Sequence, residues 1–116
     1  MIVGGGPTSI EFASELYDFL QYDISRWYPD LANKHQIVVV EAGEHLLGSF
    51  SEALSTYVEK KFVSRNIVTV TGESVQEVKE NSVILKSGGI IPYGVCVWST
   101  GNKELDLVKS LDLQLD

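Results

Sequence analysis

The chain has 116 residues, enough for one compact domain and too few for two. Its 16 acidic and 9 basic side chains give a net charge of −7, whereas binding a phosphate backbone needs the opposite sign, so nucleic acid is not an expected partner. No apolar run approaches the roughly 20 residues that span a bilayer, and no charged start with an apolar stretch suggests a signal peptide.

The first half of the chain predicts a strand, a glycine turn, a helix and a second strand. Met1–Val3 runs directly into the glycine turn, and apolar residues then recur at helical spacing from Pro7 to about Asp23. The segment Ser25–Lys34 indicates a turn or a short second helix. The unbroken Ile and Val run in Gln36–Glu41 is typical of a strand buried on both faces of a parallel sheet.

The second half predicts one more helix and several strands. Ser49 and Glu52 have capping-box spacing, so we expect a helix that starts there and ends near Asn66. Its expected apolar stripe is Phe50, Leu54, Tyr57, Val58 and Phe62. The expected strands are Ile67–Thr71, then an antiparallel meander of Ser74–Glu80, Ser82–Lys86 and Ile90-Ile91, and a last buried strand, Val95–Ser99, with Cys96 in the core.

This order predicts an α/β fold for residues 1–116: a Rossmann-like parallel sheet (β-α-β-α-β) with an antiparallel β-meander, in three layers. The short first strand and the absence of a closing element after Leu111 suggest a domain cut from a longer chain. A single cysteine cannot form an internal disulfide and favours a reducing compartment.

The turn Gly4–Ser9 matches Gly-x-Gly-x-x-Gly at its first two glycines and has Ser9 at the third. In such a turn the first glycine permits the strand-to-helix bend, and the second, here Gly6, lets the backbone approach a pyrophosphate at the helix N-terminus. The alternative is a purely structural turn. Because the motif follows a strand and opens a helix, we favour dinucleotide binding.

Glu41 ends the second strand, where a carboxylate can accept both hydroxyls of an adenosine ribose. No Arg or Lys adjoins it to hold a 2′-phosphate, so the expected cofactor is NADH rather than NADPH. The acid follows the turn at more than the usual spacing of about 20 residues. We attribute the surplus to the longer helix and the Tyr22–His35 connection. The alternative is a solvated glutamate at a strand end.

Three further features leave two readings open. Glu11, one turn into the helix, either contacts the nicotinamide end of the cofactor or is an acid favoured near a helix N-terminus. Thr100-Gly101 either approaches the cofactor at the carboxyl edge of the sheet or is a simple turn. Trp98 fits a core or an interface better than chemistry.

The sequence offers no candidate for a catalytic acid, base or nucleophile. His35 and His45 lack partners at metal-ligand spacing, so no metal site is expected.

Three blocks together resemble the type II NADH dehydrogenases, the single-subunit, rotenone-insensitive NADH:quinone oxidoreductases of mitochondria and bacteria. The blocks are Gly-Gly-Gly-Pro-Thr-Ser-Ile-Glu-Phe-Ala-Ser-Glu-Leu at 4–16, Val-Val-Val-Glu-Ala at 38–42 and Ile-Pro-Tyr-Gly-Val-Cys-Val-Trp-Ser-Thr-Gly-Asn at 91–102. Ser9 and Ser99 depart from the family pattern, which has Gly and Ala at these places.

The resemblance implies an NADH-binding domain inserted into an FAD-binding domain of the same chain. In the family, hydride passes from NADH to FAD and electrons then pass to a quinone, without proton pumping. The implied cofactor-binding residues are Gly4, Gly6, Pro7, Thr8, Glu11, Glu41, Ala42, Thr100 and Gly101. The implied place is the mitochondrial inner membrane, peripherally, or the cytoplasmic face of a bacterial plasma membrane.

The resemblance also implies that quinone and membrane contacts lie in segments outside this chain. The isolated chain is expected to bind NADH without catalysing, and an exposed Trp27–Pro29 segment would favour a homodimer. The alternatives are a stand-alone dinucleotide sensor or the NAD domain of another flavoprotein reductase, such as a ferredoxin or disulfide reductase.

Overall fold

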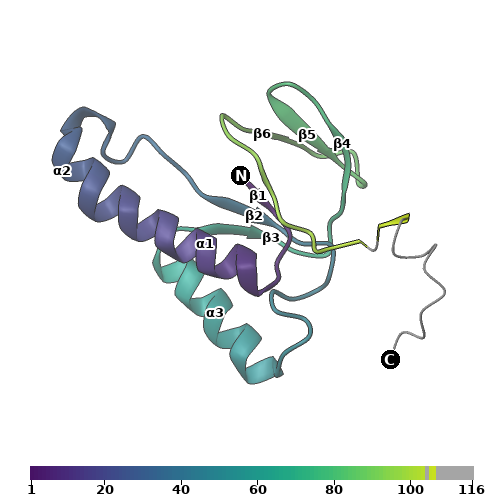
Figure 1. Ribbon diagram of the computed structural model, residues 1–116. Coiled ribbons are helices and arrows are strands. Elements are labelled where there is room, and N and C mark those ends of the chain that lie inside the picture. Colours follow the sequence, from purple (N-terminus) through teal and green to yellow (C-terminus); the bar gives the residue numbers. More distant parts are fainter. Residues whose placement is uncertain (104, 107–116) are drawn as a thin grey trace.

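The computed structural model describes residues 1–103, 105 and 106. Four short strands form a parallel sheet in the order β3-β2-β1-β7 (Figure 1). Their bounds are β1 Ile2–Val3, β2 Val38–Val40, β3 Val68–Val70 and β7 Val97–Trp98. Three more strands form an antiparallel meander: β4 Val75–Val78, β5 Ser82–Leu85 and β6 Ile90–Pro92. The predicted α/β class, with a parallel sheet and an antiparallel meander, is confirmed.

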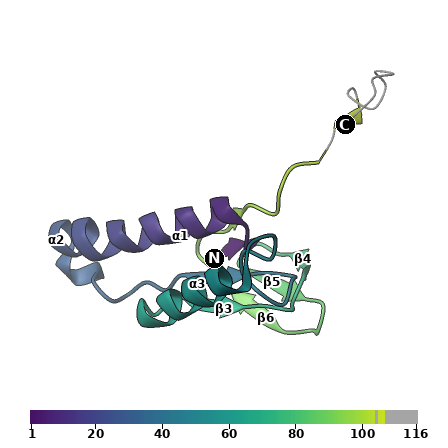
Figure 2. The same ribbon diagram turned by 90° about the horizontal axis from the view of Figure 1, so that it is seen from below.

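The predicted first helix, Pro7 to about Asp23, and the short second helix after it are both present. Helix α1 (Pro7–Asp18) continues through a π-helical segment, η1 (Phe19–Ile24), into α2 (Ser25–Trp27), and Figure 2 shows the three as one rod that runs past the strands. A 3₁₀ turn, η2 (Pro29–Leu31), follows. The second long helix is α3 (Glu52–Ser64). Both connect parallel neighbours in the sheet, as βαβ crossovers do.

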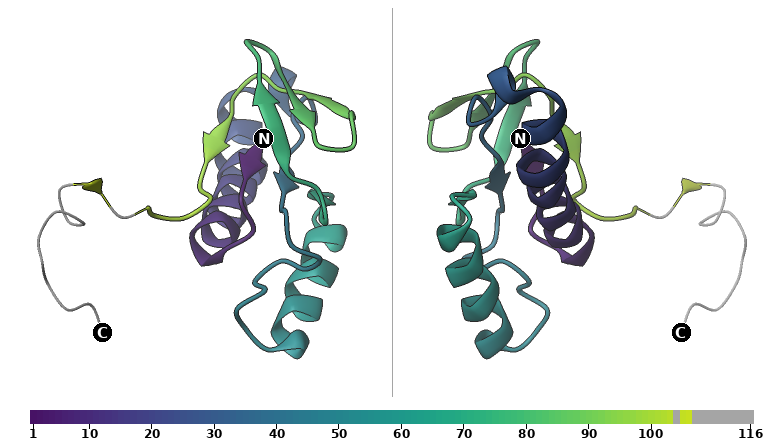
Figure 3. Two further views of the ribbon diagram at one scale, coloured as in Figure 1. Left: turned by 90° about the vertical axis from the view of Figure 1, so that its right-hand side faces the viewer. Right: turned by 90° about the vertical axis from the view of Figure 1, so that its left-hand side faces the viewer.

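The parallel sheet is the middle of three layers, with the helices on one face and the meander on the other (Figures 1 and 3). Strand β2 shows this alternation, because Val39 packs in the cluster with α1 and α3 while Val40 packs in the cluster with β5. The helix-side cluster comprises Ile2, Ile10, Ala13, Ile37, Val39, Leu46, Leu47, Phe62 and Ile67. Because both faces of β2 are covered, its Val run is continuous, as predicted.

The start of α3 differs from the prediction. Ser51, not Ser49, is the N-cap residue, and its hydroxyl accepts a hydrogen bond from the Leu54 amide at 3.4 Å. The predicted apolar stripe is also wrong in part, because Phe50, Leu54 and Tyr57 are exposed. Phe62 is buried as predicted, and Ser55, which is outside the predicted stripe, is buried too. The cause is tertiary: the loop before α3 supplies Leu46 and Leu47 to the core, and Ser55 faces them.

The last strand is not buried as expected. β7 lies at the edge of the sheet, with β1 as its neighbour, and Trp98 is 56% exposed. Cys96 is half-buried rather than in the core. An edge strand carries apolar residues without full burial, and its sequence alone does not distinguish it from a central strand.

Candidate functional site

The carboxyl ends of the parallel strands open into a cleft of about 610 Å³. The predicted cofactor residues that line it are Gly4, Gly6, Pro7, Thr8, Glu41, Ala42, Thr100 and Gly101. They come from three separate stretches: the turn after β1, the end of β2 and the segment after β7. This is the edge of a doubly wound sheet at which ligands bind.

Gly4 joins the turn to the end of β7 at a place where a side chain would not fit. Its φ is +113°, and a Cβ there would lie 2.2 Å from the carbonyl oxygen of Ser99. The Gly4 amide donates to the carbonyl of Val40 at 2.8 Å, so three chain segments meet at this residue. Only glycine is compatible with both the backbone angle and the close approach.

Gly6 has the opposite surroundings. A Cβ on Gly6 would meet no atom within 4 Å, so the backbone is open to the cleft. Gly6 is the N-cap of α1, with no side-chain cap, and Pro7 follows it. The first amides of a helix lack intrahelical acceptors and lie at the positive end of its dipole. The open backbone and these amides fit a pyrophosphate.

Glu41 is fixed by two backbone amides. The Gly5 amide donates to its Oε2 at 2.5 Å, and the Gly43 amide donates to its Oε1 at 2.7 Å. The Glu41 backbone is itself held, since its amide donates to Val70 and its carbonyl accepts from Glu73. An ionised carboxylate offers about four acceptor sites, so two remain for a ligand in the cleft.

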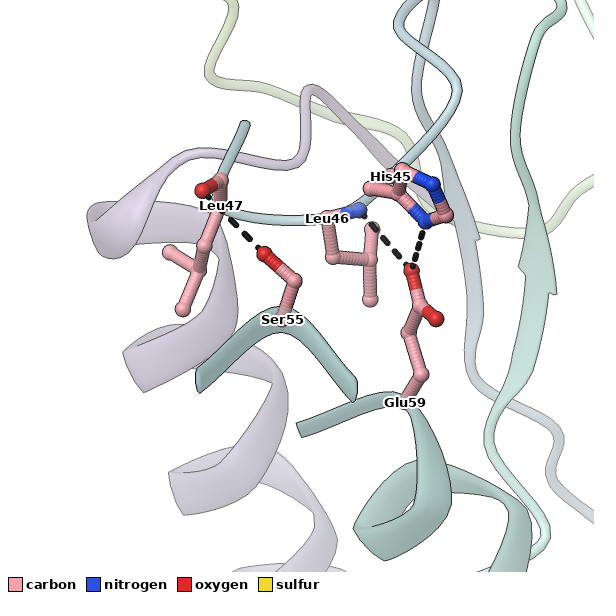
Figure 4. Close-up of polar contacts among 5 residues, drawn as sticks. All are labelled: His45, Leu46, Leu47, Ser55 and Glu59. Carbon is pink, nitrogen blue, oxygen red and sulfur yellow. Dashed lines mark hydrogen bonds and ion pairs between the residues drawn. The ribbon is translucent and has the colours of Figure 1, made fainter. Parts of the chain in front are cut away.

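The loop between β2 and α3 is anchored to α3 by Glu59 and Ser55 (Figure 4). Glu59 Oε1 accepts from the Leu46 amide at 3.2 Å and lies 3.4 Å from His45 Nδ1. The hydroxyl of Ser55 donates to the carbonyl of Leu47 at 3.4 Å. The Leu47 amide in turn donates to the carbonyl of Gly5 at 2.8 Å. Helix α3 therefore supports the glycine turn through this loop.

A second hollow of about 570 Å³ lies along the same loop. It shares Gly5, Gly6, Glu41 and Thr100 with the cleft, and its other lining residues are Gly43, Glu44, His45, Gly48 and Ser49. The contact between Gly5 and Glu41 therefore borders both the cleft and this second hollow.

The two departures from the family pattern lie against each other. Ser9 is completely buried, and its hydroxyl donates to the carbonyl of Ser99 at 3.3 Å. The larger residue at the third glycine position therefore forms a bond between α1 and the end of β7. Because the Ser9 side chain is buried, it leaves the cleft unobstructed.

Glu11 is the one predicted site residue that does not line the cleft; it is exposed on α1. The cleft residues that were not predicted as site residues are Val3, Gly5, Val40, Glu73, Ser74, Val75, Trp98, Ser99 and Asn102. Gly5 and Trp98 lie within predicted motifs, so their place in the sequence could have identified them as cleft residues. Glu73–Val75 follows β3, and its place at the cleft comes from the sheet order.

In residues 1–103, 105 and 106, no group of three or more His, Cys, Asp or Glu side chains could hold a metal ion. No helix in the same residues has the length and apolar character needed to cross a membrane.

Comparison with known proteins gives consistent results. The profile of the family described as Pyridine nucleotide-disulphide oxidoreductase matches residues 1–116. The External alternative NAD(P)H-ubiquinone oxidoreductase B1, mitochondrial, of Arabidopsis thaliana is 42% identical over 87% of this chain and 19% of its own length. The External alternative NADH-ubiquinone oxidoreductase, mitochondrial, of Yarrowia lipolytica is 40% identical over 96% of this chain and 20% of its own length.

A solved structure, NDH2 from Plasmodium falciparum in complex with NADH, superimposes with a TM-score of 0.82 at 30% identity. The match covers 86% of this chain and 22% of that one. This chain thus spans about one fifth of the length of the relatives that it matches. The chain belongs to the pyridine nucleotide-disulphide oxidoreductase family, and its predicted resemblance to the type II NADH dehydrogenases is confirmed.

Proposed function

We propose that this chain binds NADH as the dinucleotide-binding domain of an FAD-dependent, non-proton-pumping NADH:quinone oxidoreductase. The observation that carries the proposal is the pairing of an open Gly6 backbone at a helix N-terminus with the fixed Glu41 carboxylate along one cleft. The first fits a pyrophosphate and the second fits the hydroxyls of a ribose. The NADH complex of the Plasmodium falciparum structure supports the same cofactor.

Different residues of the cleft bind different parts of NADH. Gly4, Gly6, Pro7 and Thr8 hold the pyrophosphate, and Glu41 with Ala42 holds the adenosine ribose. Thr100 and Gly101 line the nicotinamide half, whereas Glu11, which does not line the cleft, is assigned no part in binding. NADH, when bound, supplies a hydride, and the protein orients it, since in such enzymes the cofactors carry the redox chemistry.

The wider setting of the domain is part of the proposal. FAD, held by an FAD-binding domain of the same chain, would accept the hydride, and a quinone reached through segments beyond these 116 residues would be the final acceptor. The relatives' names place them in mitochondria, and we propose peripheral attachment to the inner membrane. The isolated chain binds NADH and transfers nothing. A homodimer stays a prediction.

The test is a calorimetric titration with NADH and with NADPH, after circular dichroism has shown that the chain is folded. We expect saturable binding with NADH preferred. Glu41→Arg should weaken NADH binding by about tenfold or more, because it removes charged acceptors of the ribose hydroxyls, and should narrow the gap to NADPH. A folded chain that binds neither nucleotide would contradict the proposal, and an unchanged preference in the variant would remove Glu41 from the site.

A further inference from the structure

We propose that Gly5 and Gly43 set the preference for NADH over NADPH by fixing the Glu41 carboxylate. They act as positioning residues rather than as ribose ligands. The inference rests on the proposed function and adds a mechanism of discrimination to it. The relatives are named for different cofactors: NAD(P)H for the Arabidopsis thaliana protein and NADH for the Yarrowia lipolytica protein.

The Gly5 peptide is held on both sides. Its amide donates to Glu41 Oε2 at 2.5 Å, while its carbonyl accepts from the Leu47 amide at 2.8 Å. The turn therefore cannot withdraw from Glu41 without breaking its bond to the loop that α3 anchors. Since that loop also carries Gly43, both amide donors to the carboxylate belong to one connected support.

The absence of a side chain at Gly5 is required by the position of Glu41. A Cβ on Gly5 would lie 2.8 Å from both Cγ and Oε2 of Glu41 and 2.9 Å from its Cβ. Any side chain there must displace the carboxylate. At Gly43 the overlap is milder, because a Cβ would lie 3.2 Å from Oε1.

Fixing the carboxylate acts twice against a 2′-phosphate. It keeps a negative charge at the ribose, and it occupies two backbone amides that would otherwise be donors to phosphate oxygens. A Glu41 side chain free to rotate would lose both effects. NADH binding is strengthened, because the Glu41 side chain is already ordered and the entropic cost of ordering it is not incurred when the ribose hydroxyls bind.

The experiment compares three alanine variants of the 116-residue chain by titration with NADH and NADPH. Gly5→Ala should lower the NADH/NADPH affinity ratio by about tenfold, through weaker NADH binding, and Gly43→Ala should lower it less. Gly6→Ala is the matched control in the same turn. Its Cβ points into open cleft, so it should weaken both nucleotides equally and leave the ratio unchanged.

Two further variants test whether the effect of Gly5→Ala depends on Glu41. Gly94→Ala, remote from the cleft and with no atom within 4 Å of its Cβ, should change neither affinity. In a Glu41→Ala background, Gly5→Ala should leave the ratio unchanged, because the group that it displaces is absent.

The outcomes separate the inference from the function on which it rests. A wild-type chain that is folded and binds neither nucleotide overturns both. A wild-type chain that prefers NADH, with the same ratio in Gly5→Ala and Gly43→Ala, overturns this inference alone. If Gly5→Ala does not fold, Gly43→Ala decides the matter by itself.

Discussion

The two walls of the cleft differ in how they are held in place. The first wall is Glu41 and Ala42 with the loop behind them, residues 43–47. There the Glu41 carboxylate, the Gly5 peptide and this loop are joined by successive hydrogen bonds. At the second wall, residues 98–102, Ser99 is bonded to Val3 and Ser9, but Thr100–Asn102 is exposed and makes no hydrogen bond to other described residues. Trp98 there is half exposed on an edge strand.

This difference shows which wall of the cleft is held by hydrogen bonds among the described residues. The first wall is shaped by contacts within these 116 residues, so it has a defined geometry before a nucleotide binds. The second wall takes its form from two residues of β7 and the segment that follows. We therefore expect substitutions at the first wall to change cofactor discrimination and those at the second to change affinity for the nicotinamide half.

The largest expected effect comes from the residue that joins the two walls. Gly4→Ala places a Cβ 2.2 Å from the Ser99 carbonyl oxygen and forces a positive φ on alanine. We expect the free energy of unfolding to fall by about 3 kcal/mol or more, measured by urea denaturation. The control is Gly94→Ala, which has open space around its Cβ. Equal free energies of unfolding for the two variants would contradict the close approach of Gly4 to the Ser99 carbonyl.

A smaller effect is expected from the anchor of the first wall. Glu59→Ala removes the acceptor of the Leu46 amide and should lower the free energy of unfolding by about 1–2 kcal/mol. It should also weaken NADH binding several-fold, because the loop that holds Gly5 loosens. Lys60→Ala, the exposed neighbour on α3, is the control and should change neither quantity. Unaltered NADH affinity in Glu59→Ala would show that α3 does not support the turn.

The smallest effect on stability is expected at the second wall. Trp98→Ala should change the free energy of unfolding by no more than about 1 kcal/mol, because the side chain is half exposed. Its loss should nevertheless weaken NADH binding several-fold, because Trp98 lines the cleft. AMP, which carries the adenosine half only, is the comparison ligand and should bind as before. Equal losses for NADH and AMP would place Trp98 at the other wall.

Much of the fold could be predicted because its signals are local. The continuous Val run gave β2, the helical spacing after Pro7 gave α1, and the short segments split by glycines gave the meander. The predictions that failed concern burial and caps. Tyr57 is expected inside and Ser49 at the N-cap because the core residues Leu46 and Leu47 lie in a loop that has no periodicity. Cys96 is expected inside because the sequence of β7 does not reveal that it is an edge strand.

By itself, the sequence determined the glycine turn, the acid at the end of β2 and the order of the elements, since each depends on neighbours along the chain. The tertiary structure alone decided that Glu41 lies against Gly5, 36 residues away, and Ser9 against Ser99, 90 residues away. It also decided that Glu11 lies outside the cleft and that Trp98 lines it. Such contacts depend on how strands pair and helices dock, and spacing along one chain does not encode the distance between two folded segments.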